Sequence, residues 1–426
     1  MTTTYTSSLL RLLDERGYIH QTTDAAALDA LAARQVVPGY IGFDATAPSL
    51  HVGSLVQIML LRRLQQAGHK PIVLMGGGTT KVGDPSGKDE SRKLLTTQTI
   101  QANIFSIKRI FSNFLEFGDG PTDAIIVNNN DWLKNLSYIE VLRDVGPHFT
   151  INRMLTFDSV KLRLSRKQPL TFLEFNYMIL QAYDFRELAL RHGCRLQMGG
   201  SDQWGNIVNG IELTRRMERM EVFGVTTPLL TSASGAKMGK TAAGAVWLNE
   251  ESLSAYDFYQ YWRNVDDRDV GRFLRLFTDI SSKEIVKLES LQGSEINDAK
   301  RQLAFEVTKL CRGKKAAQSA QITTTSAFGS DVTVALTGQS MAVARGMVSP
   351  SILPVFTTTA SEVGIIDALV GLGFAASRGE AKRLIAGGGA RVDGEAVSDE
   401  AHVIALDGAD VRVSSGKKKH GIVRRA

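Results

Sequence analysis

Strand-like and helix-like segments alternate through the first 230 residues, and this alternation limits the fold more than any other feature of the chain. Apolar runs such as YIGFD (40–44) and KPIVLM (70–75) alternate with longer segments in which apolar residues have helical spacing, such as HVGSLVQIMLLRRLQQAG (51–68). Such alternation favours a parallel sheet with helices on both faces. The sequence therefore predicts an α/β fold with a Rossmann-like domain over 1–230, and ligands beyond the carboxyl ends of its strands.

The rest of the chain divides by composition into further parts. Residues 131–165 fit the alternation poorly and are predicted to be an insertion or a dimer surface, and 231–252 form a loop and connection. Helical spacing over 253–321 predicts an all-helical domain. Residues 322–358 are rich in Thr, Ser, Ala and Gly and indicate a linker, whereas 359–426 indicate a small α+β module.

Composition excludes several classes of protein. Apolar residues make up 43% of the 426 residues and charged residues 22%, with no apolar run of the ~18 residues that a membrane span needs. The first twenty residues do not have the pattern of a signal or transit peptide, so a cytoplasmic protein is expected. Cys194 and Cys311 lie far apart without metal-ligand spacing, which favours core packing over a disulfide or a zinc site.

The net charge of +6 is concentrated near the end of the chain. From Val411 onward there is no acidic residue. The basic residues of this segment are Arg412, Lys417, Lys418, Lys419, Arg424 and Arg425. Such a run is typical of a solvated tail, but a predicted helix with Arg378, Lys382 and Arg383 precedes it. Together they predict a compact basic module, suited to RNA phosphates, that ends in a basic tail.

Polar and turn-forming residues gather in DATAPSLHVGSL (44–55), where a strand gives way to a helix. The unpaired N–H groups at a helix start attract phosphate. Thr46 and His51 add side-chain donors there, and Gly53 lets a flat ligand approach the first turn. An ordinary helix cap with Pro48 in the turn is the alternative.

Two glycine-containing loops look like phosphate loops but lack the spacing of one. GGGTTKVGDPSGKDESR (76–92) is predicted to be a flexible polar loop that offers Asp84 and two cations, and a mobile surface loop without function is the alternative. SGAKMGKTAAG (234–244) carries Lys237 and Lys240, which suit a mobile clamp that closes on phosphate charge. The cations of the first loop are Lys88 and Arg92.

Two further stretches combine polar side chains with apolar surroundings. Tyr177, Gln181 and Asp184 are spaced four and three apart, so they share one helix face, which is either the solvated side or a line of groups that bind a small polar ligand. Asp202 and Gln203 follow a strand that ends in two glycines. Asp202 suits either a helix cap or a hydrogen bond to ribose hydroxyls.

These stretches together resemble the bacterial-type tyrosyl-tRNA synthetases, which are class I aminoacyl-tRNA synthetases. HVGS stands where that family has its HIGH signature, and KMGKT where it has KMSKS. The resemblance extends over YIGFDATAPSLH, GDPSGK, YMILQAYD and GGSDQWGN, and the C-terminal module resembles an S-four-type RNA-binding domain. It therefore covers essentially the whole chain.

The resemblance implies a role for each matching position. Tyr40 and Asp184 would bind the hydroxyl of tyrosine. The residues implied for the rest of the tyrosine site are Asp84, Tyr177 and Gln181 at the ammonium group and Gln203 near the carboxylate. Those implied for ATP are Gly42, Asp44, Gly53, Gly200 and Asp202 along the adenosine side and Thr46 and His51 at the phosphates. Lys88, Arg92, Lys237, Lys240 and Thr241 would close over the pyrophosphate.

The implied reaction forms tyrosyl-adenylate and then transfers the tyrosyl group to the terminal ribose of tRNA(Tyr). No covalent nucleophile is required; Mg²⁺ is expected to arrive with ATP, and no protein-held metal is expected. A homodimer is implied, with its contact predicted in 131–165. Ser54 replaces the second histidine of the HIGH signature and puts one ATP contact in question, whereas Gly239, in place of a serine, is expected to matter less.

Three alternatives belong to other classes or specificities. One is an RNA-binding protein without catalysis, which Ser54 favours and the retained Lys237 and Lys240 oppose. A second is a P-loop kinase or ATPase, which the failed loop spacings oppose. The third is a tryptophan-specific relative, which has no need of the hydroxyl-binding pair Tyr40 and Asp184.

Overall fold

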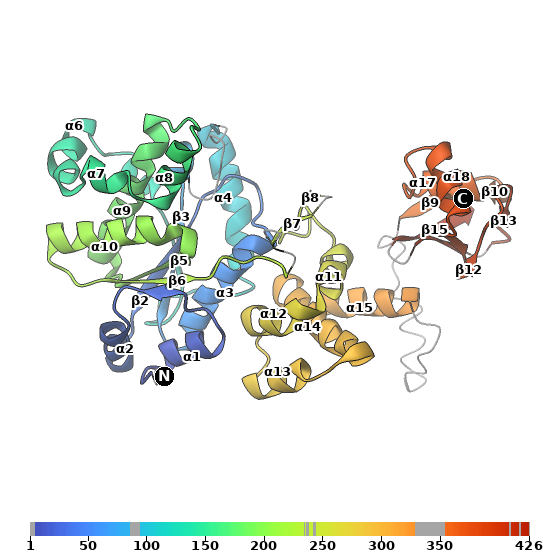
Figure 1. The fold of residues 1–426 in the computed structure, drawn as a ribbon, viewed down its shortest axis with the longest axis horizontal. Coiled ribbons are helices and arrows are strands. Elements are labelled where there is room, and N and C mark those ends of the chain that lie inside the picture. The colour runs from blue at the N-terminus through green and yellow to red at the C-terminus, as the bar shows by residue number, and fades with distance from the viewer. Residues whose placement is uncertain are drawn as a thin grey trace. The chain divides into compact units, whose positions relative to one another are not determined.

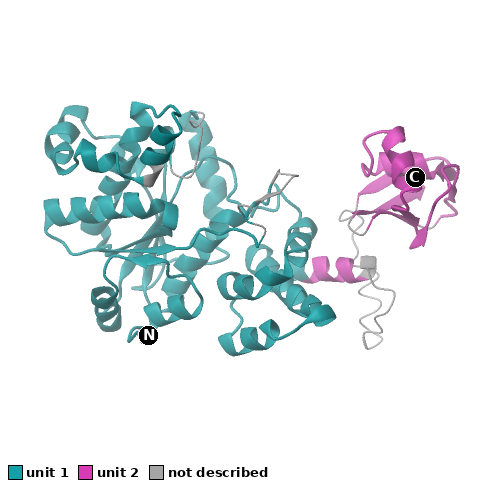
Figure 2. Cartoon of the chain, in the orientation of Figure 1, with its two compact units in different colours: residues 1–317 teal, residues 318–426 magenta. Residues whose placement is uncertain are grey.

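The computed structural model describes residues 5–85, 94–233, 235, 238–241, 244–328, 354–408, 410–416 and 419–425. The chain forms two compact units, residues 1–317 and 318–426 (Figure 2). Each unit is described by itself below. Within the described residues, no helix is both long and apolar enough to cross a bilayer.

A six-stranded sheet organises the first unit (Figure 1). Its strands, in spatial order, are β1 (Gln21–Thr22), β6 (Phe223–Thr227), β5 (Leu196–Gly200), β2 (Pro38–Phe43), β3 (Lys70–Met75) and β4 (Ile125–Asn128). All neighbours pair in parallel except β1, which lies antiparallel to β6 at the edge. The predicted α/β fold with a parallel sheet is thus confirmed.

The order of the strands creates a switch point between β2 and β5. The chain runs outward from β2 through β3 to β4, and then returns to add β5 and β6 on the other side of β2. Connections leave β2 and β5 in opposite directions. In sheets of this kind, ligands bind beyond the carboxyl ends of the strands at such a switch point. The apolar strands β2 and β3 are mostly buried, as expected for the centre of a covered sheet.

Helices cover both faces of this sheet. The longer ones are α1 (Ser8–Glu15), α2 (Ala25–Arg34), α3 (Val52–Gln66), α4 (Thr97–Phe111), α9 (Phe172–His192) and α10 (Trp204–Glu218). Figure 1 shows α9 and α10 on one side and α1, α2 and α3 on the other. The bounds of α9 follow from its sequence, because Thr171 and Glu174 form a capping box and Gly193 ends the helix at φ +60°.

The alternation breaks between β4 and α9, where the chain forms short helical turns. They are α5 (Asn130–Leu133), α6 (Tyr138–Glu140), the π-turn Val141–Val145, α7 (Ile151–Met154) and α8 (Asp158–Ser165). Several large apolar side chains here are exposed, including Tyr138 at 62%, Ile139 at 68% and Ile151 at 60%. Apolar surface of this extent is typical of a contact with another protein surface.

An all-helical region follows, as the sequence predicts. It contains α11 (Ala255–Arg263), α12 (Val270–Phe277), α13 (Ser282–Glu289), α14 (Ile296–Arg312) and α15 (Lys314–Phe328). Trp262 packs against Phe258, Phe273 and Phe277 in its core. Both ends of the linker predicted over 322–358 are structured instead, because α15 continues to Phe328 and β9 begins at Val355. The part of the predicted linker over 329–353 lies outside the described residues.

After the end of α15, the second unit contains two small sheets and two further described helices. Its strands are β9 (Val355–Thr358), β10 (Glu362–Gly364), β11 (Ala390–Val392), β12 (Glu395–Ala396), β13 (Val403–Ala405), β14 (Val411–Ser415) and β15 (Lys419–Arg425), and its helices are α17 (Ile365–Gly371) and α18 (Arg378–Ala386). The prediction of a basic tail is wrong, because β14 and β15 pair antiparallel inside a five-stranded sheet. Val413 and Val423 are fully buried there, which explains why these strands are held in the domain. Lys417 and Lys418 lie outside the described residues.

Candidate functional site

The predicted ATP-side residues meet at the switch point between β2 and β5. Asp44 follows β2 directly, and Gly200 ends β5. Asp202 lies in the next turn and does not cap α10, whose N-cap is Gln203 without a side-chain cap bond. Its carboxylate lies against Gly200 instead, because a Cβ atom at Gly200 would come within 2.6 Å of Asp202 Oδ1. Gly42 and Thr46 are exposed beside them.

The helix start predicted in DATAPSLHVGSL is confirmed. His51 is the N-cap of α3, and its Nδ1 accepts a hydrogen bond from the Gly53 N–H at 2.9 Å. Since Nδ1 is the acceptor, a neutral His51 carries its proton on Nε2, which makes that nitrogen a donor. Gly53 needs its missing side chain, because a Cβ atom there would lie 2.6 Å from the His51 ring.

A buried carboxylate lies deeper in the site. Asp184 is 2% exposed and accepts hydrogen bonds from Asn129 Nδ2 at 2.9 Å and Trp132 Nε1 at 2.7 Å. Burial raises the pKa of Asp184 to about 8, although these two bonds lower it in part. The solvated-face alternative for this stretch of α9 is therefore wrong, since Tyr177 and Asp184 are both buried.

A buried hydroxyl without a partner accompanies this carboxylate. Tyr40 is 1% exposed, its ring packs edge-on against Phe185, and its hydroxyl has no hydrogen-bond partner among the described residues. Burial, and then the Asp184 charge, raise the pKa of Tyr40 well above 10, so the hydroxyl keeps its proton. A buried polar group normally has a partner in a finished site. The orphaned hydroxyl therefore fits a ligand that supplies a hydroxyl group.

Hydrogen bonds join this pocket to the end of β2. Asn129 Nδ2 also donates to Thr79 Oγ1 at 3.0 Å, and Thr79 Oγ1 donates to Asp44 Oδ1 at 2.8 Å. The Tyr177 hydroxyl donates to Asp44 Oδ2 at 3.1 Å. Burial and the nearby carboxylates raise the pKa of Tyr177 well above 10, so it remains a donor.

A second row of hydrogen bonds connects the remaining predicted residues. Gln203 Nε2 donates to Asp84 Oδ2 at 2.9 Å, and Asn206 Nδ2 lies 3.1 Å from both Gln203 Oε1 and Gln181 Oε1. The structure thus brings Asp84, Gln181 and Gln203 together through Asn206. This row offers a carboxylate and amide groups to a small zwitterion.

The glycine-rich loop after β3 is only partly a surface loop. Thr79 and Thr80 are 3% and 5% exposed, and a Cβ atom at Gly76 would lie 2.2 Å from Asp44 Oδ1. The start of this loop is therefore part of the site's buried scaffold, and the alternative of a mobile surface loop is wrong for it. Lys88 and Arg92 lie outside the described residues.

The lysine-containing loop lies beside the start of α3. The backbone of Lys240 and Thr241 forms β7 (Lys240–Thr241), which pairs with β8 (Gly244–Ala245). The Val246 N–H donates to the Gly239 carbonyl at 3.0 Å, and the Val52 N–H donates to the Val246 carbonyl at 2.9 Å. Lys237 lies outside the described residues.

Sequence reasoning missed four residues that hold the site together. They are Thr79, Asn129, Trp132 and Asn206. Asn129 could have been found, because it follows the strand-like run AIIVN, and side chains beyond the carboxyl end of a parallel strand face the ligand crevice. Trp132 and Asn206 carry no such signal in one sequence.

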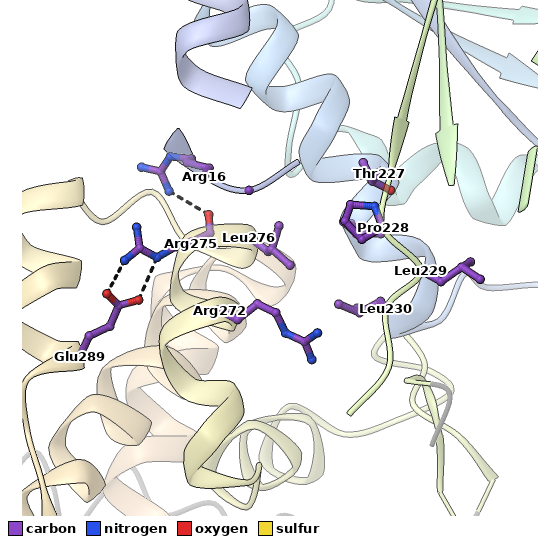
Figure 3. A pocket seen from close by; sticks show the side chains of 11 residues that line it. Arg16, Thr227, Pro228, Leu229, Leu230, Arg272, Arg275, Leu276 and Glu289 are labelled. Atoms are coloured by element: carbon purple, nitrogen blue, oxygen red, sulfur yellow. Dashed lines mark hydrogen bonds and ion pairs between the residues drawn. The ribbon is translucent and has the colours of Figure 1, made fainter. Parts of the chain in front are cut away.

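A separate cavity of about 380 Å³ lies between the end of β6 and α12 (Figure 3). No residue predicted for the site lines it. Its wall combines Pro228 and Leu230 with arginine side chains that already have partners: Arg275 pairs with Glu289, and Arg16 donates to the Arg275 carbonyl. The cavity therefore lies inside the first unit, between the end of β6 and α12, and its arginine side chains are already engaged.

Sequence similarity to known proteins gives the class of this chain. A sequence model described as "tRNA synthetases class I (W and Y)" matches residues 34–329, and the chain belongs to this family. The tyrosine–tRNA ligase of Novosphingobium aromaticivorans is 70% identical over 424 residues, which are 100% of each chain. That of Zymomonas mobilis is 59% identical over 422 residues, 99% of each.

The fold agrees with this sequence similarity. A C-terminally truncated mitochondrial tyrosyl-tRNA synthetase from Aspergillus nidulans superimposes with a TM-score of 0.68 and 31% identity, covering 75% of this chain and 94% of that one. The resemblance stated from the motifs is confirmed. Within the described residues, no group of three or more His, Cys, Asp or Glu side chains is placed to hold a metal ion.

Proposed function

We propose that the chain activates tyrosine with ATP, forming tyrosyl-adenylate and pyrophosphate, and transfers the tyrosyl group to the 3′-terminal ribose of tRNA(Tyr). The family and its full-length tyrosine-specific relatives support this reaction. The observation that carries the choice of tyrosine is the unpartnered hydroxyl of Tyr40 in the buried pocket of Asp184. Both groups complete their hydrogen bonding when a phenolic hydroxyl enters.

Tyrosine is held at both of its ends. Tyr40 and Asp184 bind the phenolic hydroxyl, and the polar row beyond them binds the amino-acid group. In that row Asp84, Tyr177 and Gln181 receive the ammonium group, and Gln203 lies near the carboxylate. The hydrogen bonds of Tyr177 to Asp44 and of Gln203 to Asp84 support this assignment, because they fix the direction of each donor before the substrate arrives.

ATP occupies the switch point and the start of α3. Thr46 and His51 donate to its phosphates, helped by the N–H groups of the first helical turn. Residues proposed along the adenosine are Gly42, Asp44, Gly53, Gly200 and Asp202. Residues proposed around the pyrophosphate are Lys88, Arg92, Lys237, Lys240 and Thr241.

Catalysis comes from alignment and charge. The tyrosine carboxylate attacks the α-phosphorus, the bond from that phosphorus to the bridging oxygen breaks, and pyrophosphate leaves with the electron pair. The cationic side chains stabilise the charge that collects on pyrophosphate. Mg²⁺ enters as part of the substrate MgATP. No covalent intermediate with the protein is required.

Transfer to tRNA(Tyr) uses the parts beyond the sheet. The all-helical region at 253–321 and the S-four-like module at 359–426 contact tRNA phosphates, which makes binding sensitive to salt. Two chains form a homodimer through the insertion at 131–165, and its exposed apolar side chains support this. The protein works in the cytoplasm, where tRNA and ATP are available.

The alternatives have less support. An indole N–H can only donate a hydrogen bond, so tryptophan does not need a pair of groups that both donate to and accept from a ligand hydroxyl. Both full-length relatives named above carry the tyrosine name. A P-loop enzyme has no support from the family that matches. An RNA-binding protein without catalysis does not account for the orphaned Tyr40 hydroxyl.

Amino-acid-dependent exchange of labelled pyrophosphate into ATP tests the proposal. Tyrosine, phenylalanine and tryptophan are compared at equal concentration. Exchange with tyrosine alone is expected. Exchange with tryptophan instead would establish the other specificity, and a folded protein that binds tRNA(Tyr) without any exchange would contradict catalysis.

A further inference from the structure

Gly239 occupies the position at which the KMSKS signature has serine, and the structure gives this glycine a specific contact. Its φ angle is +95°, a conformation that side-chain-bearing residues rarely adopt. A Cβ atom added to it would lie 2.7 Å from the Gly53 nitrogen and 2.8 Å from His51 Nδ1. The expectation that this substitution matters little therefore does not follow from the structure.

The same contact also leaves no room for a side chain at Gly53. A Cβ atom at Gly53 would lie 3.0 Å from the Met238 carbonyl oxygen, besides its collision with the His51 ring. The two glycines thus allow two backbones to touch: the segment before Lys240 and the first turn of α3. At least one atom in each collision is backbone, which cannot rotate away as the end of a flexible side chain can.

Hydrogen bonds hold Gly239 in this place. Its carbonyl accepts from the Val246 N–H, and the Val246 carbonyl accepts from the Val52 N–H, so three stretches lie side by side. Tyr261 of α11 also forms a hydrogen bond with the Gly239 backbone. This bond lowers the pKa of Tyr261 in part, although burial raises it to about 12. Met238 is itself 7% exposed.

We propose that Gly239 is a positioning residue for the adenylation step, because its missing side chain lets the lysine-containing segment lie directly on the ATP-binding start of α3. The inference rests on the proposed function. It assigns to Gly239 the register between the backbone of the Lys240 segment and the helix start at His51. A serine at this position, although it restores the signature, is expected to force the segments apart.

Three variants of the full-length chain separate contact from backbone strain. G239A and G239S add a side chain at the contact. G235A is the matched control, because Gly235 lies in the same loop at φ +81° but has no atom of the described residues within 4 Å of an added Cβ atom. G235A therefore carries the cost of a positive φ angle without the collision.

The measurements are pyrophosphate exchange with varied ATP, tyrosine binding by equilibrium dialysis, and hydrogen exchange of the Val52 and Val246 amides. For both Gly239 variants we expect kcat of exchange to fall at least tenfold, tyrosine Kd to stay within twofold, and both amides to exchange faster. A small displacement of catalytic groups is enough for such a loss. G235A is expected to stay within threefold in kcat, with both amides unchanged.

Several results would overturn the assignment. They are a G239S enzyme as active as the parent, a loss in G235A equal to that in G239A, or a loss of tyrosine binding that parallels the loss of kcat. If the parent chain shows no tyrosine-dependent exchange, the proposed function fails. The amide measurement still tests the contact in that case, and unchanged exchange at Val52 and Val246 in both Gly239 variants would refute it.

Discussion

Removing the hydroxyl of Tyr40 is expected to stabilise the free protein and to weaken its reaction with tyrosine. The hydroxyl is buried without a partner among the described residues. A buried polar group left unsatisfied costs about 1–3 kcal/mol, and Tyr40→Phe removes that group while keeping the ring that packs on Phe185. We therefore expect the free energy of unfolding to rise by about 1 kcal/mol or more.

The effect on catalysis has the opposite sign. When tyrosine is bound, the Tyr40 hydroxyl gains a partner, and a neutral hydrogen bond contributes about 1 kcal/mol. Tyr40→Phe loses this bond and also the relief of the unpaired hydroxyl, about 2 kcal/mol together, which lowers kcat/KM for tyrosine by about thirtyfold, since 1.4 kcal/mol corresponds to about tenfold. Phenylalanine leaves the hydroxyl unpaired in the parent, so its kcat/KM is expected to stay equal or to rise.

Tyr18→Phe is the matched control. Tyr18 is equally buried, but its hydroxyl donates to the Leu276 carbonyl. Its removal is therefore expected to lower the free energy of unfolding by about 1 kcal/mol and to leave the tyrosine-to-phenylalanine ratio unchanged. Urea unfolding and pyrophosphate exchange measure the two effects. A destabilised Tyr40→Phe protein, with equal losses for both amino acids, would refute the reasoning.

Three further predictions concern the same scaffold and the second unit. Burial raises the pKa of Asp184 from 3.8 to about 8, so its contribution to stability is complete below about pH 4 and is lost as pH rises toward 8. Asp184→Asn should therefore remove the fall in the free energy of unfolding with rising pH. An unchanged slope of that free energy in urea unfolding between pH 5 and 8.5 would contradict this. The Asn129 side chain makes three buried hydrogen bonds, to the Gly78 N–H, Thr79 and Asp184. Asn129→Ala should therefore lower the free energy of unfolding by about 2–4 kcal/mol. The control Asn130→Ala should lower it by less than about 0.5 kcal/mol, because the Asn130 side chain accepts only a surface hydrogen bond from Lys81. A chain that ends at Phe328 should keep tyrosine-dependent pyrophosphate exchange, while its affinity for tRNA(Tyr) falls and depends less on salt. If the shortened and the full-length chains bind tRNA(Tyr) equally well at all salt concentrations, the second unit does not contact the RNA.

The sequence predicts the sheet and the helical region well because their signals are local. Alternating apolar runs mark β2 and β3, and the helical spacing of α3 and α14 is visible without tertiary information. The end of the chain is harder. The basic residues around β15 look like a tail, and only pairing with β14 and burial of Val423 show that they form a strand.

The site is predicted where motifs carry it and missed where packing does. His51 and Asp184 belong to recognisable stretches, and the structure places His51 at the start of α3 and buries Asp184 in α9. Trp132 and Asn206 are ordinary residues in sequence, and their importance follows from their hydrogen bonds to Asp184 and to the two glutamines Gln181 and Gln203. Spacing along one helix cannot reveal such a partner, because Asp184 and Trp132 lie 52 residues apart.

Helix α3 makes contacts at both of its ends within the first unit. Its first turn carries His51 and touches Gly239, whereas its last turns carry Arg62 and Arg63, which both pair with Asp279 at 2.6 Å beside α12. Burial would raise the pKa of Asp279, but the two arginines lower it, so the carboxylate stays charged. Arg63 is 1% exposed and Asp279 is 30% exposed, so the pair is partly shielded from water. Helix α3 therefore spans from the turn at His51 to the end of α12, where Arg62 and Arg63 hold it through Asp279.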